Sequence, residues 1–407
     1  MIVWRDGTVV GAAELRSGVQ QVDVMEADGT LRQAVHYTDV RPPLVCGDRV
    51  VVNVTAAALG LDGGLCLIHD VAERREPDEA SASEGAEAEQ ENTAGLGASP
   101  KQRYPGDDEE RESFAQEQGQ LQSGHIMKLR YMPQQRAVLA VEEEASPHRR
   151  LFAEPRQLDG MPVLIGELHS MLPVAVAWIR GSGEGVSLRL SYIMTDGGAL
   201  PLVLSGHTAR LRASGWLDGT VTYGHAYGGD LEAVNKYTAL LAARHVQGAD
   251  IAIVTMGPGI VGTGTPFGHT ATELAELVHA VRALGGKPVV MARVSFAEAR
   301  ERHRGVSHHV RETLGKLALA RAAIPLPDEL EEPHKRLIRR QLEESGCADR
   351  HDPLWVPGVG LAEAERRLAA YDAPITTMGR QLRDDPAFFL TVCAAAQAAL
   401  SAAGGRR

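Results

Sequence analysis

The sequence predicts an α/β protein with a Rossmann-like parallel sheet that carries helices on both faces. A small β-barrel-like domain precedes this sheet, and a helical extension follows it. Three observations indicate this: short strand-like runs fill the first 70 residues, continuous apolar runs alternate with helix-length segments from 160 to 325, and helical patterns follow. Continuous Val, Ile and Leu are typical of parallel strands buried on both faces. We therefore expect domains at 1–155, 160–325 and 326–407.

The N-terminal region contains short segments of alternating apolar and polar residues. Asp28 and Gly29 separate two of them, which is a hairpin signal because glycine tolerates positive φ. Five such strands in about 70 residues predict a small barrel or half-barrel. The expected strands are 1–10, 18–25, 32–37, 49–54 and 65–69, and strand-like sequence resumes at 125–131 and 137–142.

Residues 71–123 interrupt this pattern with an acidic segment. It holds 14 acidic and 5 basic residues, so it carries a net −9 of the chain's −11. Because it has few large apolar residues, we expect a disordered insertion inside the β domain. The remaining chain is nearly neutral, which argues against a nucleic-acid-binding surface.

The region from 160 to 325 alternates strands and helices. Asp230 is the expected N-cap of the helix 231–245. The expected strands are 161–168, 188–194, 220–223, 251–256 and 288–294, with 317–324 as a possible sixth. The expected helices are 170–179, 199–214, 231–245 and 270–284, followed in the extension by 333–345, 361–371 and 386–403.

The composition also indicates the cellular compartment of the protein. Four scattered cysteines without a CxxC pair are typical of a reducing compartment. The N-terminus does not read as a signal peptide, and there is no run of about 18 apolar residues. We therefore expect a cytoplasmic protein that does not span a membrane. The oligomeric state stays open, and a homo-oligomer is one possibility.

Polar residues follow the expected parallel strands, and the carboxyl ends of such strands meet at one edge of a sheet where ligands bind. His169, Asp196 and Asp230 come from three of these loops, and His308 and His309 follow the fifth strand. We expect these residues to serve as catalytic acid–base groups. A metal site is the alternative use, although adjacent His308 and His309 should point apart in a helix or strand.

The loop after the fourth strand is rich in glycine. Gly257, Gly259 and Gly262 match GxGxxG, but the helix begins too far downstream and the expected acidic residue is absent, so dinucleotide binding is not favoured. We expect the loop to hold a phosphate or carboxylate near a helix N-terminus. The structural alternative is a tight turn beside neighbouring strands. The candidate binding residues are Gly257, Gly259, Gly262, Thr263, Gly264 and Thr265.

Several segments together resemble one family, number 3866 in the domain-of-unknown-function series, found in Gram-positive bacteria. The resemblance covers nearly the whole chain except the acidic insertion, and it implies no activity, substrate or cofactor. The segments that carry it are TDGGALP (195–201), GGDLEAV (228–234), GPG (257–259), GTGT (262–265), ERHRGVSHH (301–309), SPH (146–148) and ELHS (167–170).

The favoured function is an enzyme, a hydrolase or group transferase, that acts on a small phosphate- or carboxylate-bearing molecule. The alternatives are a non-catalytic sensor of a nucleotide-like ligand and a scaffold protein. The sequence does not identify the substrate or a cofactor.

Overall fold

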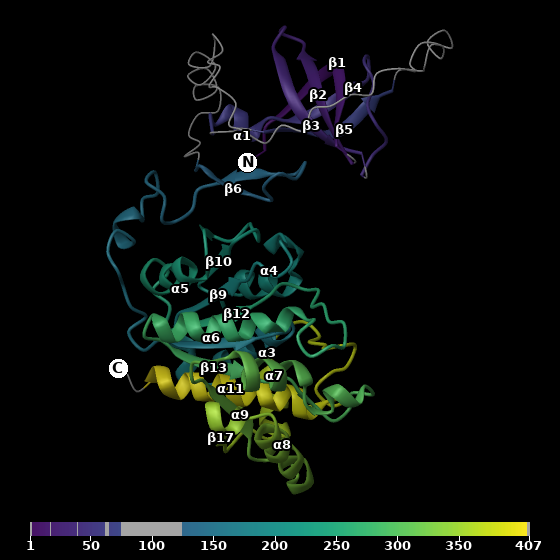
Figure 1. Cartoon of the computed structure of the whole chain (residues 1–407). Coiled ribbons are helices and arrows are strands. Elements are labelled where there is room, and N and C mark those ends of the chain that lie inside the picture. Colours follow the sequence, from purple (N-terminus) through teal and green to yellow (C-terminus); the bar gives the residue numbers. More distant parts are fainter. Residues whose placement is uncertain (1, 17, 39, 62–64, 75–123, 405–407) are drawn as a thin grey trace. The chain divides into compact units, whose positions relative to one another are not determined.

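The structure is a computed structural model, and it describes residues 2–16, 18–38, 40–61, 65–74 and 124–404. The chain divides into two compact units, Met1–Leu139 and Ala140–Arg407 (Figure 1). We describe each unit by itself.

The first unit is a closed five-stranded barrel, as predicted. Its strands follow the order β1-β2-β3-β5-β4, and β1 also pairs with β4 to close the barrel. Valines at alternate positions fill its interior, including Val22 and Val24 of one strand and Val50 and Val52 of another. The strands are β1 (Trp4–Arg16), β2 (Val19–Glu26), β3 (Leu31–Tyr37), β4 (Arg49–Asn53) and β5 (Cys66–Glu73).

Three short elements complete this unit: α1 (Thr55–Ala58) and the two-stranded sheet of β6 (Ile126–Lys128) and β7 (Arg136–Val138). The expected insertion lies almost wholly outside the described residues. Its first three residues do not belong to it, because β5 continues to Glu73 and pairs with β4 there.

The second unit contains an eight-stranded parallel sheet in the order β11-β10-β9-β12-β8-β13-β16-β17. The central strands are apolar and buried on both faces, which confirms the predicted Rossmann-like sheet. The strands are β8 (Pro162–Gly166), β9 (Leu190–Met194), β10 (Gly219–Tyr223), β11 (Leu231–Ala233), β12 (Ile251–Thr255), β13 (Lys287–Met291), β16 (Ala323–Pro327) and β17 (Asp352–Val356).

Helices cover both faces of this sheet. α3, α10 and α11 contact one another, α5 contacts α6, and right-handed crossovers place these two groups on opposite faces (Figure 1). The helices are α3 (Met171–Arg180), α4 (Gly206–Ala213), α5 (Lys236–His245), α6 (Glu273–Ala283), α7 (His308–Glu312), α8 (Glu332–Glu344), α9 (Cys347–Arg350), α10 (Leu361–Leu368) and α11 (Pro386–Gly404).

Helix α11 is the one described helix that is long and apolar enough to cross a membrane, but 72% of its most apolar window is buried inside the unit. It packs against α3 and against β8, β13 and β16. Burial on a sheet explains its composition, so α11 is a core helix of a globular unit.

Three expectations about elements are wrong. The segment expected as helix 231–245 begins with strand β11, and α5 starts only at Lys236, capped by Asn235. The sixth strand, expected at 317–324, is instead β16 (Ala323–Pro327), because residues 313–317 form a π-helical turn. Strand β17 lies in the segment expected to be entirely helical.

Candidate functional site

The candidate site lies where the sheet connections diverge. The connection after β8 leads past β12 to β9, whereas the connection after β12 leads past β8 to β13. Loops that leave neighbouring strands in opposite directions open a crevice at the carboxyl edge, which is the usual ligand position in such sheets. Glu167 follows β8, and the glycine-rich loop follows β12.

Glu167 holds one histidine in place. His309 Nδ1 donates to Glu167 Oε2 over 2.8 Å, and the Glu167 side chain is fully buried. A carboxylate only accepts hydrogen bonds, so this contact places the ring proton on Nδ1 and leaves the lone pair on Nε2. The buried Arg293 guanidinium lies 3.8 Å from Glu167 Oε1 and compensates the buried negative charge.

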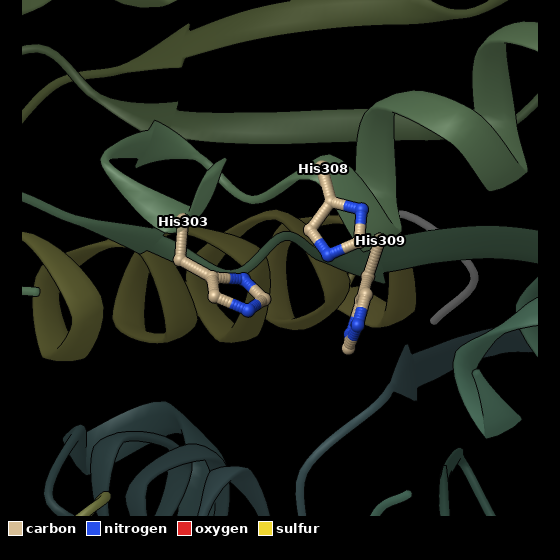
Figure 2. Close-up of side chains that lie close together, drawn as sticks. All are labelled: His303, His308 and His309. Atoms are coloured by element: carbon tan, nitrogen blue, oxygen red, sulfur yellow. The ribbon is translucent and has the colours of Figure 1, made fainter. Parts of the chain in front are cut away.

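Two further histidines gather around His309 (Figure 2). His303 ends the short 3-10 turn η5 (Glu301–His303), and His308 begins α7. One ligand atom from each of the three rings lies within 4.8 Å of the others. The expectation that His308 and His309 point apart is therefore wrong, since their ring centroids are 4.5 Å apart.

Hydrogen bonds and ring stacking hold the group of His303, His308 and His309 in place. Ser307 caps α7 by accepting from the His309 backbone N–H, and its hydroxyl is hydrogen-bonded to His303 Nδ1 over 2.8 Å. His269, which precedes the 3-10 turn η4 (Thr270–Thr272), stacks on His309 with ring centroids 4.1 Å apart. His308 Nε2 is buried and has no hydrogen-bond partner among the described residues.

Burial favours the neutral form of three rings in this group, His269, His303 and His308. It lowers the pKa of His303 to about 3, helped by the nearby charge of Arg293, and lowers the pKa of His308 to about 4. The pKa of His269 is also lowered, again mainly by burial. At neutral pH these imidazoles therefore offer lone pairs, which are needed for proton uptake or for metal binding.

The glycine-rich loop reaches this group. An added Cβ at Gly262 would lie 3.1 Å from His309 Nε2, so any side chain at this position would crowd that nitrogen. Gly264 has φ +81° and lies beside the guanidinium of the exposed Arg302. The glycine-rich loop therefore borders the histidine group, and the Arg302 guanidinium adds a positive charge beside this loop.

The expected anion contacts differ from those observed. The hydroxyls of Thr263 and Thr265 lie 2.9 Å apart, and both also bond to the backbone of Gly268, so they close the loop on itself. The first turn of α6 already carries Glu273 and Glu276, which disfavour an anion at that helix N-terminus. Of the other candidates, Gly257 packs against Leu200 and Met194, and Gly259 supplies a positive-φ turn.

His169 lies near β8 but belongs to a different hydrogen-bond network. Its Nε2 is 2.6 Å from Ser205 Oγ, and its Nδ1 is 3.3 Å from the Tyr192 hydroxyl. Ser205 also caps α4 by accepting from Thr208 N. Burial lowers the pKa of His169 to about 4. The described contacts of His169 therefore involve β9 and α4, and not the three histidines.

Asp196 lines a hollow of about 410 Å³ at the ends of β9 and β10. Its Oδ1 accepts from the His225 backbone N–H over 2.7 Å. Glu273 also lines this hollow and accepts hydrogen bonds from Thr195 and Tyr223, while burial raises its pKa. None of the three clustered histidines lines it.

Asp230 does not lie at the carboxyl edge. Its carboxylate accepts from Thr220 N over 2.9 Å and pairs with Arg212, both near the start of β10. The chain turns back after β10, so that Leu231 pairs with Val221. The expectation that Asp230 joins the site is wrong for this reason.

The predicted site residues do not include four residues of this arrangement: Glu167, His269, Arg293 and His303. Two of them carried a usable signal, since Glu167 and Arg293 directly follow the apolar strand runs before them. A charge in such a position is buried, and a buried charge needs a partner. His269 and His303 carried no comparable signal, because only the folded loops bring them together.

Comparison with known proteins identifies the family of the chain. No curated protein and no solved structure gives a significant match. A family profile described as "Protein of unknown function (DUF3866)" matches residues 33–396, which include barrel strands β4 and β5 and the histidine group. The chain therefore belongs to the DUF3866 family of proteins of unknown function.

Proposed function

We propose that this protein is an enzyme that hydrolyses a small phosphate- or carboxylate-bearing molecule, or transfers a group from it. The observation that carries the proposal is the close approach of Gly262 to His309 Nε2, which would lie 3.1 Å from an added Cβ, while Glu167 holds the other ring nitrogen. The His309 imidazole, which is buried and oriented by Glu167, faces a loop that carries no side chain at Gly262. This arrangement supports activation of a water or hydroxyl at the free ring nitrogens.

Arg302 supports the anionic character of the substrate. It is exposed, lies beside Gly264, and is close enough to lower the pKa of His308. A guanidinium binds phosphate and carboxylate groups well. In hydrolysis, the water oxygen bonds to phosphorus or to the acyl carbon, the bond to the leaving oxygen breaks, and one water proton ends on the leaving group.

The proposed location is the cytoplasm. The described cysteines, Cys46, Cys66, Cys347 and Cys393, are all free thiols, and three of them are buried. Free thiols fit a reducing compartment.

The test is a screen of small phosphate esters and carboxylate esters for turnover, with thermal shift to detect binding. A ligand that binds the native state raises the melting temperature. We expect His309→Gln to lower turnover at least about 100-fold, because proton transfer contributes on that scale. The matched control is His148→Gln, which lies outside the site.

A second pair of variants separates an enzyme from a sensor. In an enzyme, His308→Asn loses turnover but keeps affinity for the ligand, whereas a sensor binds the ligand without turnover in every variant. Asp196→Asn tests whether the hollow at β9 takes part. Neither turnover nor a thermal shift with any ester would contradict the proposal and favour a scaffold protein.

A further inference from the structure

We propose that His303, His308 and His309 together bind one divalent transition-metal ion of the Zn²⁺ class. One coordination position would stay open toward the glycine-rich loop. The inference concerns the site of the proposed function and would explain how that site activates water, but metal binding itself does not require turnover.

The distances suit a site that closes around an ion. The three ligand atoms lie within 4.8 Å of one another. An ion equidistant from them would therefore lie at most about 2.8 Å from each nitrogen, and Zn–N bonds are about 2.0–2.1 Å long. Each ring needs to move inward by less than about 1 Å, which a small side-chain rotation provides.

The outer contacts of two rings orient their Nε2 atoms. Glu167 accepts from Nδ1 of His309, and the Ser307 hydroxyl is placed to accept from Nδ1 of His303. Metal-bound histidines characteristically donate their second nitrogen to a carboxylate or another oxygen. The Glu167 carboxylate selects the neutral His309 tautomer in which Nε2 carries the lone pair, and the Ser307 hydroxyl, which can donate or accept, is compatible with the same tautomer of His303.

The third ring supplies an independent observation. The His308 side chain is buried, with a residue exposure of 8%, and its Nε2 has no hydrogen-bond partner among the residues that the structure describes. A buried polar atom without a hydrogen-bond partner destabilises the folded state. An ion bound by this nitrogen would remove that destabilisation.

The charges around the cluster permit a cation and an anionic ligand beside it. Arg293 is nearby, but Glu167 and Glu298 both pair with it. Arg302 is exposed and lies beside Gly264 in the loop. Three imidazole ligands with an open fourth position are the donor set of some catalytic zinc sites, and imidazole also suits Cu, Ni and Fe.

The experiment uses the full chain, stripped with a chelator and dialysed, with Zn²⁺ and Co²⁺ alone as probes. We expect one ion per chain, a higher melting temperature, and the visible absorption of tetrahedral Co²⁺. His303→Ala, His308→Ala and His309→Ala should each weaken binding at least about 10-fold, and Glu167→Gln by about 10- to 100-fold. The control His148→Ala should bind like the wild type.

X-ray absorption of the Zn²⁺-loaded wild type keeps the inference testable if a histidine variant fails to fold. Three imidazole nitrogens at about 2.0–2.1 Å would support it. Absence of stoichiometric binding, or a ligand set without three histidines, would overturn it. Full ester turnover in chelated protein that also fails to bind Zn²⁺ stoichiometrically would overturn the metal site and leave the proposed function standing. Tight Zn²⁺ binding without turnover of any ester would support the metal site and contradict the proposed function.

Discussion

Glu167 and His309 are 142 residues apart in the chain, yet His309 Nδ1 donates to Glu167 Oε2 over 2.8 Å in the interior of the second unit. The contact joins the end of β8 to the start of α7. Arg293, which follows β13, pairs with the same carboxylate. Three segments of the site therefore depend on one buried negative charge.

Removing that charge should destabilise the second unit. Glu167→Ala leaves Arg293 paired with Glu298 and deprives His309 Nδ1 of its acceptor. Breaking a buried ion pair by deleting one partner costs about 3–5 kcal/mol. Urea denaturation measures this cost, and Glu365→Ala is the control, since its partner Arg383 is largely exposed and the pair should contribute less than about 1 kcal/mol. Equal losses for both variants would contradict the importance of the buried cluster.

A side chain at Gly262 should block the site without unfolding the protein. The Cβ of Gly262→Val would approach His309 Nε2 to 3.1 Å, and the valine methyl groups would fill the approach from the loop. We expect loss of turnover and weaker Co²⁺ binding, with an unchanged melting temperature because the loop is exposed. Gly183→Val is the matched control, because no atom lies within 4 Å of its added Cβ. Wild-type turnover in Gly262→Val would rule out this approach to His309.

The sheet was predictable because its strands are continuous apolar runs separated by helix-length segments. Strands β11 and β17 were not, since each is short or only partly buried and lacks that pattern. The cap of α5 had a readable signal, because Asn235 and Thr238 form a capping box, whereas Asp230 was the expected N-cap of a helix predicted to begin at 231.

The histidine group shows a different limit of sequence reasoning. Adjacent residues in a helix diverge by about 100° at their Cβ atoms, which predicts that His308 and His309 separate. Their rings extend beyond Cβ, however, and converge to a centroid distance of 4.5 Å. Local periodicity fixes Cβ directions, but tertiary contacts such as the one from Glu167 decide where a ring ends.

The network of His169 should make stability depend on pH. Burial lowers its pKa to about 4 in the folded state, against about 6.5 in the unfolded chain, so the unfolded state binds more protons between these values. The contribution is complete above about pH 6.5 and is lost as the pH falls toward about 4, by roughly 2–3 kcal/mol.

Unfolding in urea at about pH 5 and about pH 7.5 measures this dependence. His169→Asn should flatten the pH dependence relative to the wild type, while other buried histidines still contribute in both proteins. His148→Asn should leave the slope unchanged. An identical slope for His169→Asn and the wild type would show that His169 titrates normally in the folded state.

The position of Asp196 depends on Gly224, and a pair of alanine variants tests this. Gly224 has φ +62°, and an added Cβ would lie 2.4 Å from Asp196 Oδ2, with the Asp196 Cβ also within 2.7 Å. The whole Asp196 side chain must then move, which breaks its hydrogen bond from His225 N.

The control for this variant is Gly215→Ala. Gly215 has φ +71° and no atom within 4 Å of its added Cβ, so Gly215→Ala reports backbone strain alone, about 1–2 kcal/mol. We expect Gly224→Ala to lower the free energy of unfolding by about 1–2 kcal/mol more than Gly215→Ala, because it adds a steric clash and a lost hydrogen bond to the same strain. If the whole Asp196 side chain is removed first, in Asp196→Gly, that excess should disappear, and its persistence would show that Gly224 is constrained by something other than Asp196.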